Sequence, residues 1–168
     1  INDFLSLCCD RMGKRKEVIS CLGIAVLSDI RTNFVSSNGS DFSSSVKVIQ
    51  HELSVTSKKN REIQSRSWGN VAQVGLELFN KDLFLSQANR ILEESIELLD
   101  APECPNEEMD LILMPDQMIL QIHESIGHPL ELDRILGDER NYAGWSFVNP
   151  ENFGNLKYGS EILNVTFD

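Results

Sequence analysis

The sequence predicts an α+β fold in two domains, residues 1–105 and 106–168. Alternation of apolar and polar residues between positions 18 and 68 indicates antiparallel strands. Apolar residues at three- and four-residue intervals over 82–99 are typical of an amphipathic helix. A polar, proline-containing connection follows, so we expect an antiparallel meander covered by a helix and then the start of a second α+β domain.

The first domain begins with two strands. Val18 to Ile30 is apolar enough for a buried strand, and Asn38-Gly39 suits the positive φ angles of a hairpin turn. Val46 to Thr56 alternates in two phases, which predicts a bulge near Ile49-Gln50.

A second turn at Lys58-Lys59-Asn60 and a third strand over Glu62 to Trp68 complete the meander, which needs a cover on one face. The helix Asp82 to Leu99 supplies it, and Asp100-Ala101-Pro102 ends that helix. Its inward residues are expected to be Leu85, Ala88, Ile91 or Leu92, Ser95 and Leu99.

The second domain opens with Met109 to Met114, which resembles a short buried strand. Pro115-Asp116 then predicts a helix start, because proline needs no helical N–H partner and aspartate can cap. Met118, Ile119, Ile122 and Ile126 form the apolar face of this helix.

Composition excludes several classes of function. A net charge of -11 over 168 residues leaves no broad basic surface, so we expect no nucleic-acid partner. The longest apolar run, Ile19 to Leu27, is too short for a membrane span. Four cysteines, two of them adjacent, do not suit a disulfide framework, which favours a reducing, cytoplasmic setting and no cysteine chemistry.

The stretch QIHESIGHPLELD, Gln121 to Asp133, carries the strongest chemical signal. Histidines four apart on an α-helix lie about 40° from each other around the axis and can bind one ion, but His123 and His128 are five apart, about 140°. Gly127 tolerates unusual backbone angles, and Pro129 disfavours the α region at His128. We therefore expect the helix to end or kink within the motif; a π-type bulge would have the same effect.

These residues suggest a zinc site. Neutral imidazoles of His123 and His128 are suitable ligands, and Glu124 is placed to act as general base toward a water that attacks a carbonyl. Catalytic zinc has three protein ligands, and the third is not evident. Glu131 and Asp133 are expected to support or cap rather than ligate, although direct ligation stays open.

Simpler interpretations stand beside this one. His123 and His128 can be two ordinary histidines near a helix end, but their occurrence with a glutamate and a glycine favours a metal. His51, alone in a strand, is expected to be structural. Trp68 and Trp145 are expected to pack in the core or at the rim rather than line a groove.

Four segments together resemble the TldD/PmbA family, chiefly through H-E-x-x-x-H. They are DLILMPDQ (110–117), HESIGHPLELDR (123–134), GDE (137–139) and YAGWSFV (142–148). Weaker similarity extends upstream through Arg66-Ser-Trp-Gly-Asn to Ala101-Pro-Glu-Cys-Pro and downstream through Tyr158-Gly-Ser-Glu.

The resemblance implies a zinc metallopeptidase that acts on unfolded or small peptides in peptide maturation and protein turnover, often as a homo- or heteromeric two-subunit assembly. His123 and His128 match the family's metal ligands and Glu124 its catalytic glutamate. The third ligand would be a downstream cysteine, so we expect this chain, from Ile1 to Asp168, to be a segment of a longer protein. The family's amino-terminal domain is not found in this segment. Trp145 stands where the family often has a smaller residue, which suggests a narrower cleft or an added apolar subsite.

Two alternatives from other classes remain. One is a non-catalytic subunit that binds a partner or peptide and keeps the motif as a structural remnant. The other is an interaction module whose sheet edges bind a peptide without cutting it.

Overall fold

The computed structural model describes residues 1–166 and confirms the α+β fold class. The chain divides into two compact units, Ile1–Pro105 and Asn106–Asp168, each with its own internal contacts. No helix among the described residues is both long enough and apolar enough to cross a membrane.

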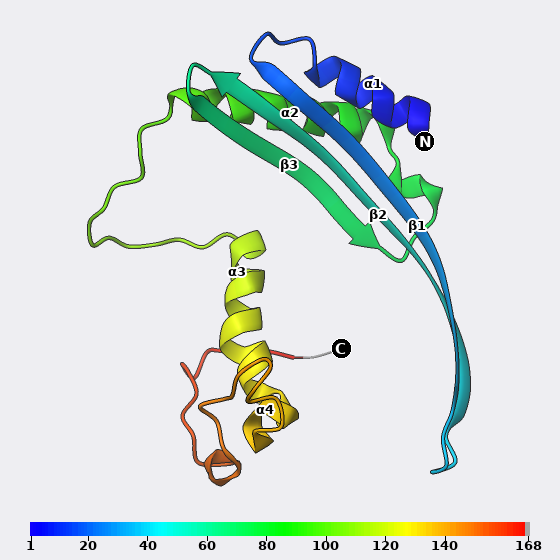
Figure 1. The fold of residues 1–168 in the computed structure, drawn as a ribbon, viewed down its shortest axis with the longest axis vertical. Helices are drawn as coiled ribbons and strands as arrows, with labels where there is room; N and C mark the ends of the chain where they lie inside the picture. The colour runs from blue at the N-terminus through cyan, green and yellow to red at the C-terminus, as the bar shows by residue number, and fades with distance from the viewer. Residues whose placement is uncertain (167–168) are drawn as a thin grey trace. The chain divides into compact units, whose positions relative to one another are not determined.

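The first unit is a three-stranded antiparallel meander with helices on one face (Figure 1). Its strands lie in the order β1-β2-β3, and α1 and α2 pack against each other and against the sheet. The elements are α1 (Asn2–Met12), β1 (Val18–Val35), β2 (Asp41–Lys59), β3 (Glu62–Ala72) and α2 (Lys81–Glu97), with short 3-10 turns at Leu76–Leu78 and Leu98–Asp100.

Both predicted turns are confirmed. The β1–β2 hairpin closes with Val35 opposite Asp41, and Gly39 adopts φ +93°, a conformation that L side chains rarely take. The second turn places Asn60 at φ +57°, the left-handed region that asparagine tolerates better than most residues. These two positions therefore fix where each strand reverses.

The bulge predicted near Ile49-Gln50 is wrong. The β1–β2 register runs without a shift through these positions, and the one irregularity falls between Val18 and Ser20. Residues 49, 51, 53, 55 and 57 already share one face of β2, the face that is buried under the helices. Val46 and Val48 point to the other face, so the two apolar phases mark two faces of one regular strand.

The predicted covering helix is confirmed, and it buries one apolar stripe. Leu85, predicted to point inward, is only partly buried, while Phe84 is completely buried. Pairing of the buried hydroxyls of Ser57 and Ser95, 2.8 Å apart, joins β2 to α2. The core of this unit consists of Leu5, Cys8, Met12, Leu53, Val55, Phe84, Ala88, Ile91 and Leu92.

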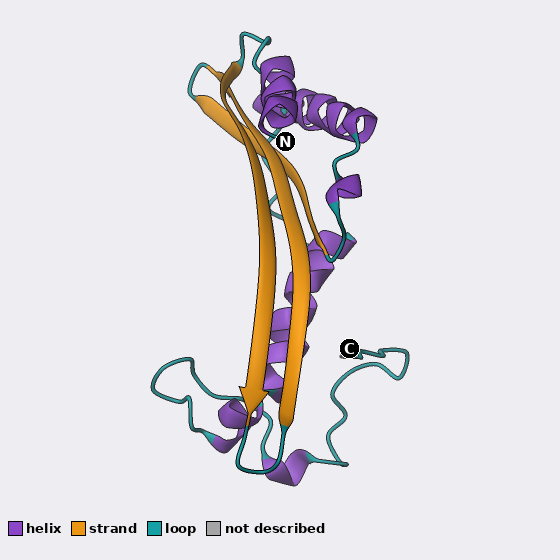
Figure 2. Ribbon diagram, turned by 90° about the vertical axis from the view of Figure 1, so that its right-hand side faces the viewer, coloured by secondary structure: helices purple, strands orange, loops and turns teal. Residues whose placement is uncertain are grey.

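β1 and β2 continue together past the end of β3 (Figure 2). The last β2 residue paired with β3 is Ile49, opposite Ala72. Residues 28–48 therefore form a two-stranded projection, called here the distal ribbon.

The described part of the second unit is helical. It contains α3 (Pro115–Ile122), a π turn His123–Gly127, a 3-10 turn His128–Leu130, α4 (Leu132–Leu136) and a 3-10 turn Pro150–Asn152. The predicted strand Met109–Met114 is wrong, because a strand needs a hydrogen-bonded neighbour and none lies beside this exposed segment among residues 1–166. The helix start at Pro115 is confirmed, but Met114 occupies the cap position and Asp116 lies in the first turn, where its charge suits the helix dipole.

Candidate metal centre

A π turn brings the two histidines of the motif together. α3 ends at Ile122, and the backbone N–H of His128 then donates to the carbonyl of His123, five residues earlier. Such a bond places residues five apart on the same face of the helix, much as residues four apart share a face in an α-helix. The predicted break within the motif is confirmed in its π-type form.

The roles predicted for Gly127 and Pro129 in this break are not those seen. His128 stays in the α region at φ -59° and ψ -42°, and Gly127 adopts φ -57° and ψ -72°. A Cβ on Gly127 would meet only the carbonyl oxygen of Ile122, at 4.0 Å. Pro129 is the second residue of the next 3-10 turn, His128–Leu130, where its missing N–H costs nothing. The extra residue is thus absorbed by the hydrogen-bond pattern and not by an unusual glycine conformation.

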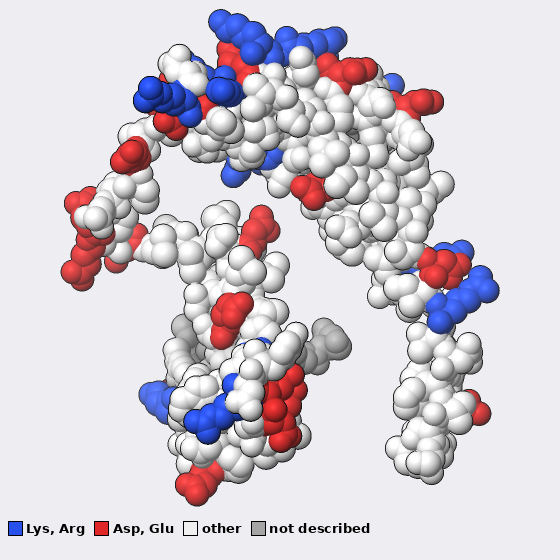
Figure 3. Space-filling model, viewed as in Figure 1, with Lys and Arg blue, Asp and Glu red and all other residues white. Residues whose placement is uncertain are grey.

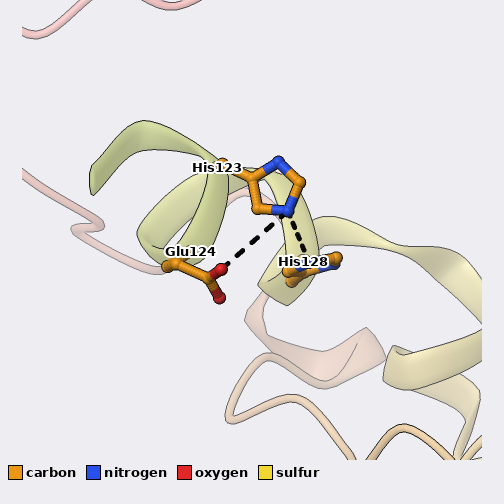
Figure 4. Close-up of side chains that lie close together, drawn as sticks. All are labelled: His123, Glu124 and His128. Atoms are coloured by element: carbon orange, nitrogen blue, oxygen red, sulfur yellow. Dashed lines mark hydrogen bonds and ion pairs between the residues drawn. The ribbon is translucent and has the colours of Figure 1, made fainter. Parts of the chain in front are cut away.

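The side chains of the motif converge on one point (Figure 4). The Nε2 atoms of His123 and His128 are 2.7 Å apart, with ring planes at 88°. The Oε1 atom of Glu124 lies 3.9 Å from Nε2 of His123. All three potential ligand atoms fall within 4.8 Å of one another, so the structure brings together the three residues predicted from the sequence.

Glu131 fixes the ring of His128. Its Oε1 atom is 2.9 Å from Nδ1 of His128, and because a carboxylate only accepts, Nδ1 donates. The Arg134 guanidinium pairs with the other carboxylate oxygen and also donates to the carbonyl of Ala143 at 2.9 Å. The hydrogen bond from His128, followed by the nearby Arg134 charge, lowers the pKa of Glu131.

This contact determines the tautomer at the site. With the proton of His128 on Nδ1, its Nε2 carries a free lone pair and accepts a hydrogen bond from Nε2–H of His123. Glu131 is therefore a support behind the histidine, the arrangement common at protein zinc ligands. Asp133 is different: its carboxylate accepts from the backbone N–H of Arg134 at 2.8 Å.

Two further residues hold the turn, and the sequence pattern did not identify them. The Tyr158 hydroxyl donates to the carbonyl of Ser125 inside the π turn. The Ser146 hydroxyl, largely buried, donates to the carbonyl of Pro129 at 2.6 Å. Both are distant in sequence from the motif, so no spacing rule signals them.

The histidine pair fits zinc after a small adjustment. Two nitrogens at about 2.0–2.1 Å from a tetrahedral ion are about 3.3 Å apart, so the observed pair must open by about 0.6 Å. Rotation of the exposed His123 ring can provide this, with its proton carried on Nδ1. The donor set of two imidazoles with a carboxylate nearby also suits zinc better than magnesium or calcium, which prefer oxygen.

The other candidate residues lie in ordinary structural positions. His51 is buried and packs against Trp68 and Phe84 at ring distances of 4.6 Å, which confirms a structural role. Trp145 is 72% exposed, with the Arg140 guanidinium 5.6 Å from its ring centre. The cysteines are free; burial raises the pKa of the Cys8, Cys9 and Cys21 thiols, which disfavours thiolate chemistry.

No family model, no curated protein and no solved structure matches this chain. The resemblance to the TldD/PmbA family therefore stays a prediction from the sequence motifs.

Proposed function

We propose that this chain carries part of a zinc peptidase site, with His123 and His128 as metal ligands and Glu124 as general base. The observation that supports it best is the convergence of the two Nε2 atoms, 2.7 Å apart across the π turn. Histidines placed at random on a helix five residues apart would face different directions. The support from Glu131 adds a second independent feature of a metal-binding histidine.

Zinc bound there would supply a Lewis acid that polarises a carbonyl and lowers the pKa of water. Glu124 is exposed on the same side as the histidines and makes no ion pair with Lys or Arg among the described residues, so its carboxylate is free to accept a proton. Its Oε1 atom lies 3.9 Å from Nε2 of His123, which supports its assignment as the base and not as a group behind a ligand. This chemistry needs no serine or cysteine nucleophile.

The proposal includes a third protein ligand in addition to His123 and His128. The cluster that contains both histidines consists of His123, Glu124 and His128, and Glu124 is assigned to proton transfer. By its resemblance to the TldD/PmbA family, we infer a downstream cysteine as the third ligand and unfolded or small peptides as substrates. Assembly with a related or identical subunit and a cytoplasmic location complete the proposal, the latter supported by four free cysteines.

The test measures metal content and peptide cleavage in the full-length protein. Glu124→Gln is expected to keep zinc and abolish cleavage, because it removes the base and retains the shape of the side chain. His123→Ala is expected to lose both zinc and cleavage. Asp116→Asn, on the exposed surface of α3, is the matched control and is expected to change neither.

The outcomes separate this function from its alternatives. Cleavage retained by Glu124→Gln refutes the assigned base. Zinc bound without cleavage in the unaltered protein supports a non-catalytic subunit instead. Peptide binding that is indifferent to a chelator supports an interaction module.

A further inference from the structure

In residues 1–166, the outer edge of β1 has no strand beside it. The strand order β1-β2-β3 puts β1 at the side of the sheet, and no strand in residues 1–166 pairs with that side. At 18 residues it is long for an edge strand. An exposed edge of this kind offers a row of backbone donors and acceptors to another strand.

The distal ribbon is poorly protected by its own chain. Ile30, Phe34 and Phe42 on one of its faces are 51%, 45% and 52% exposed. The rings of Phe34 and Phe42 stack on each other at 5.2 Å, which covers only part of each. Two-stranded hairpins alone are at best marginally stable in water, so a further paired strand would stabilise this one.

Charge on the ribbon is sparse, and two of its charged residues flank Ile30. Its charged residues are Asp29, Arg31, Asp41 and Lys47, and Figure 3 shows a patch of blue and red on an otherwise mostly white projection. Asp29 and Arg31 both belong to the edge strand, where the guanidinium lies 3.4 Å from the carboxylate. Their side chains are 43% and 76% exposed, so both are available to another molecule.

We propose that this edge pairs with the same edge of a second copy of the chain, antiparallel and centred on Ile30. The two three-stranded sheets would then form one six-stranded sheet related by a two-fold axis. The occupant is identified by charge complementarity, because the edge is complementary to itself in this register and not in its neighbours.

Backbone geometry restricts the choice of register. Residues directly opposite in an antiparallel pair have the same hydrogen-bonding type, so a symmetric pair must be centred on a residue and not between two. Centring on Asp29 or on Arg31 sets like charges against each other. Centring on Ile30 sets Asp29 opposite Arg31 of the second copy, twice by symmetry. The same register places Val26 opposite Phe34.

The helices do not obstruct this pairing. α1 packs over the beginning of β1, where a Cβ on Gly23 would lie 3.1 Å from Cβ of Leu5. In the register centred on Ile30, position 23 of one copy falls opposite position 37 of the other, beyond the end of its strand. Each pair of helices therefore covers an opposite end of the joint sheet.

Charge reversal tests both the partner and the register. Asp29→Arg and Arg31→Asp each convert two attractive pairs into two repulsive ones, so each variant alone should weaken self-association by at least about tenfold. The double variant Asp29→Arg/Arg31→Asp restores complementarity and should associate like the unaltered chain. An equimolar mixture of the two single variants should form a heterodimer.

Sedimentation equilibrium over a concentration series measures each association, and native mass spectrometry identifies the heterodimer. These exposed positions lie away from the core, and circular dichroism checks that every variant keeps its fold. An unaltered chain that stays monomeric throughout the series overturns the proposal, since the charges then serve only to keep the edge soluble. Single variants that associate as strongly as the unaltered chain also overturn it.

A cross-link tests the centre of symmetry directly. Ile30→Cys places two thiols opposite each other, within the range that a disulfide can span. Thr32→Cys is the matched control, because the thiols would be separated by four residues along the strands, about 13 Å. In a Cys104→Ser background, oxidation should link the first variant and not the second. Equal cross-linking of both variants would contradict the register.

Discussion

Replacement of His51 by phenylalanine is the sharpest test of the core of the first unit. His51 is 1% exposed on β2, between the rings of Trp68 and Phe84. Neither of its ring nitrogens has a hydrogen-bond partner among the described residues. The side chain therefore packs as an aromatic ring while a buried donor and a buried acceptor remain unpaired.

The expected gain at neutral pH follows from those two atoms. A buried polar group without a partner costs about 1–3 kcal/mol, and phenylalanine removes both while keeping the aromatic contacts. The phenyl ring is larger than imidazole, so the steric cost of overpacking offsets part of this gain in stability. We expect His51→Phe to raise the free energy of unfolding by about 1–3 kcal/mol at about pH 7.5.

The pH dependence supplies a second, more specific signal. Burial lowers the pKa of His51 from its ordinary value of 6.5, so below about pH 6.5 the unfolded chain binds the proton more readily than the folded one. The contribution of neutral His51 to stability is therefore fully present above the pKa of the unfolded chain. It is lost as the pH falls from there toward the lower pKa of the folded chain. The loss is about 1.4 kcal/mol per pH unit in that window. The phenylalanine variant should lack this slope.

Urea unfolding followed by Trp68 fluorescence measures both effects, in a Trp145→Phe background that removes the other tryptophan. Curves at about pH 7.5 and about pH 5.5 bracket the histidine window. Subtracting the variant from the parent removes the contributions that the two proteins share. An identical pH slope in parent and variant, or a loss of stability at the higher pH, would refute the buried, unpaired state of His51.

Three further predictions concern the site and the core. Glu131→Ala should weaken zinc binding about 10- to 100-fold in a competition titration, because it frees the His128 ring. Gly127→Ala should leave zinc affinity and thermal stability nearly unchanged, because its Cβ meets only one backbone oxygen, at 4.0 Å; a large loss would mean that the turn needs glycine. Ser95→Ala should cost more unfolding free energy than Ser57→Ala, by about 1 kcal/mol in urea titration, because it leaves the buried Ser57 hydroxyl without its acceptor, whereas Ser95 retains a backbone carbonyl.

The first unit could be predicted from the sequence because its signals are local. Gly39 and Asn60 lie in the two predicted turns, and both adopt positive φ angles. The helix over 81–97 was visible as a period in the apolar residues. The bulge was mispredicted at the point where β3 stops, since alternation alone cannot show that the two faces of a strand have different surroundings.

The prediction of a strand over Met109–Met114 was wrong for a related reason. Its composition is that of a buried strand, yet Leu111 and Ile112 are 76% and 87% exposed. A strand is defined by the neighbour with which it pairs, and that information lies outside the segment itself. Propensity therefore indicated what the segment is suited to form, and the described residues provide no partner for it.

The motif shows how far spacing alone can determine a site. A five-residue separation excludes a regular α-helix as the frame for one metal ion, but it allows either a broken helix or a π turn. Gly127 and Pro129 favoured the break, because both are breakers by their intrinsic chemistry. The structure keeps both histidines helical and lengthens the hydrogen bond pattern by one residue, from the N–H of His128 to the carbonyl of His123.

The π turn itself holds the two histidines at their separation. An i→i+5 bond joins the two candidate ligands through their own backbones, so their separation depends on the turn itself and not on a flexible hinge. The remaining freedom is ring rotation, which Glu131 restricts at His128 and which stays open at the exposed His123. We therefore expect the His123 ring to rotate when zinc binds, while the His128 ring remains fixed. This rotation would open the distance between the two Nε2 atoms from 2.7 Å to the spacing that zinc requires.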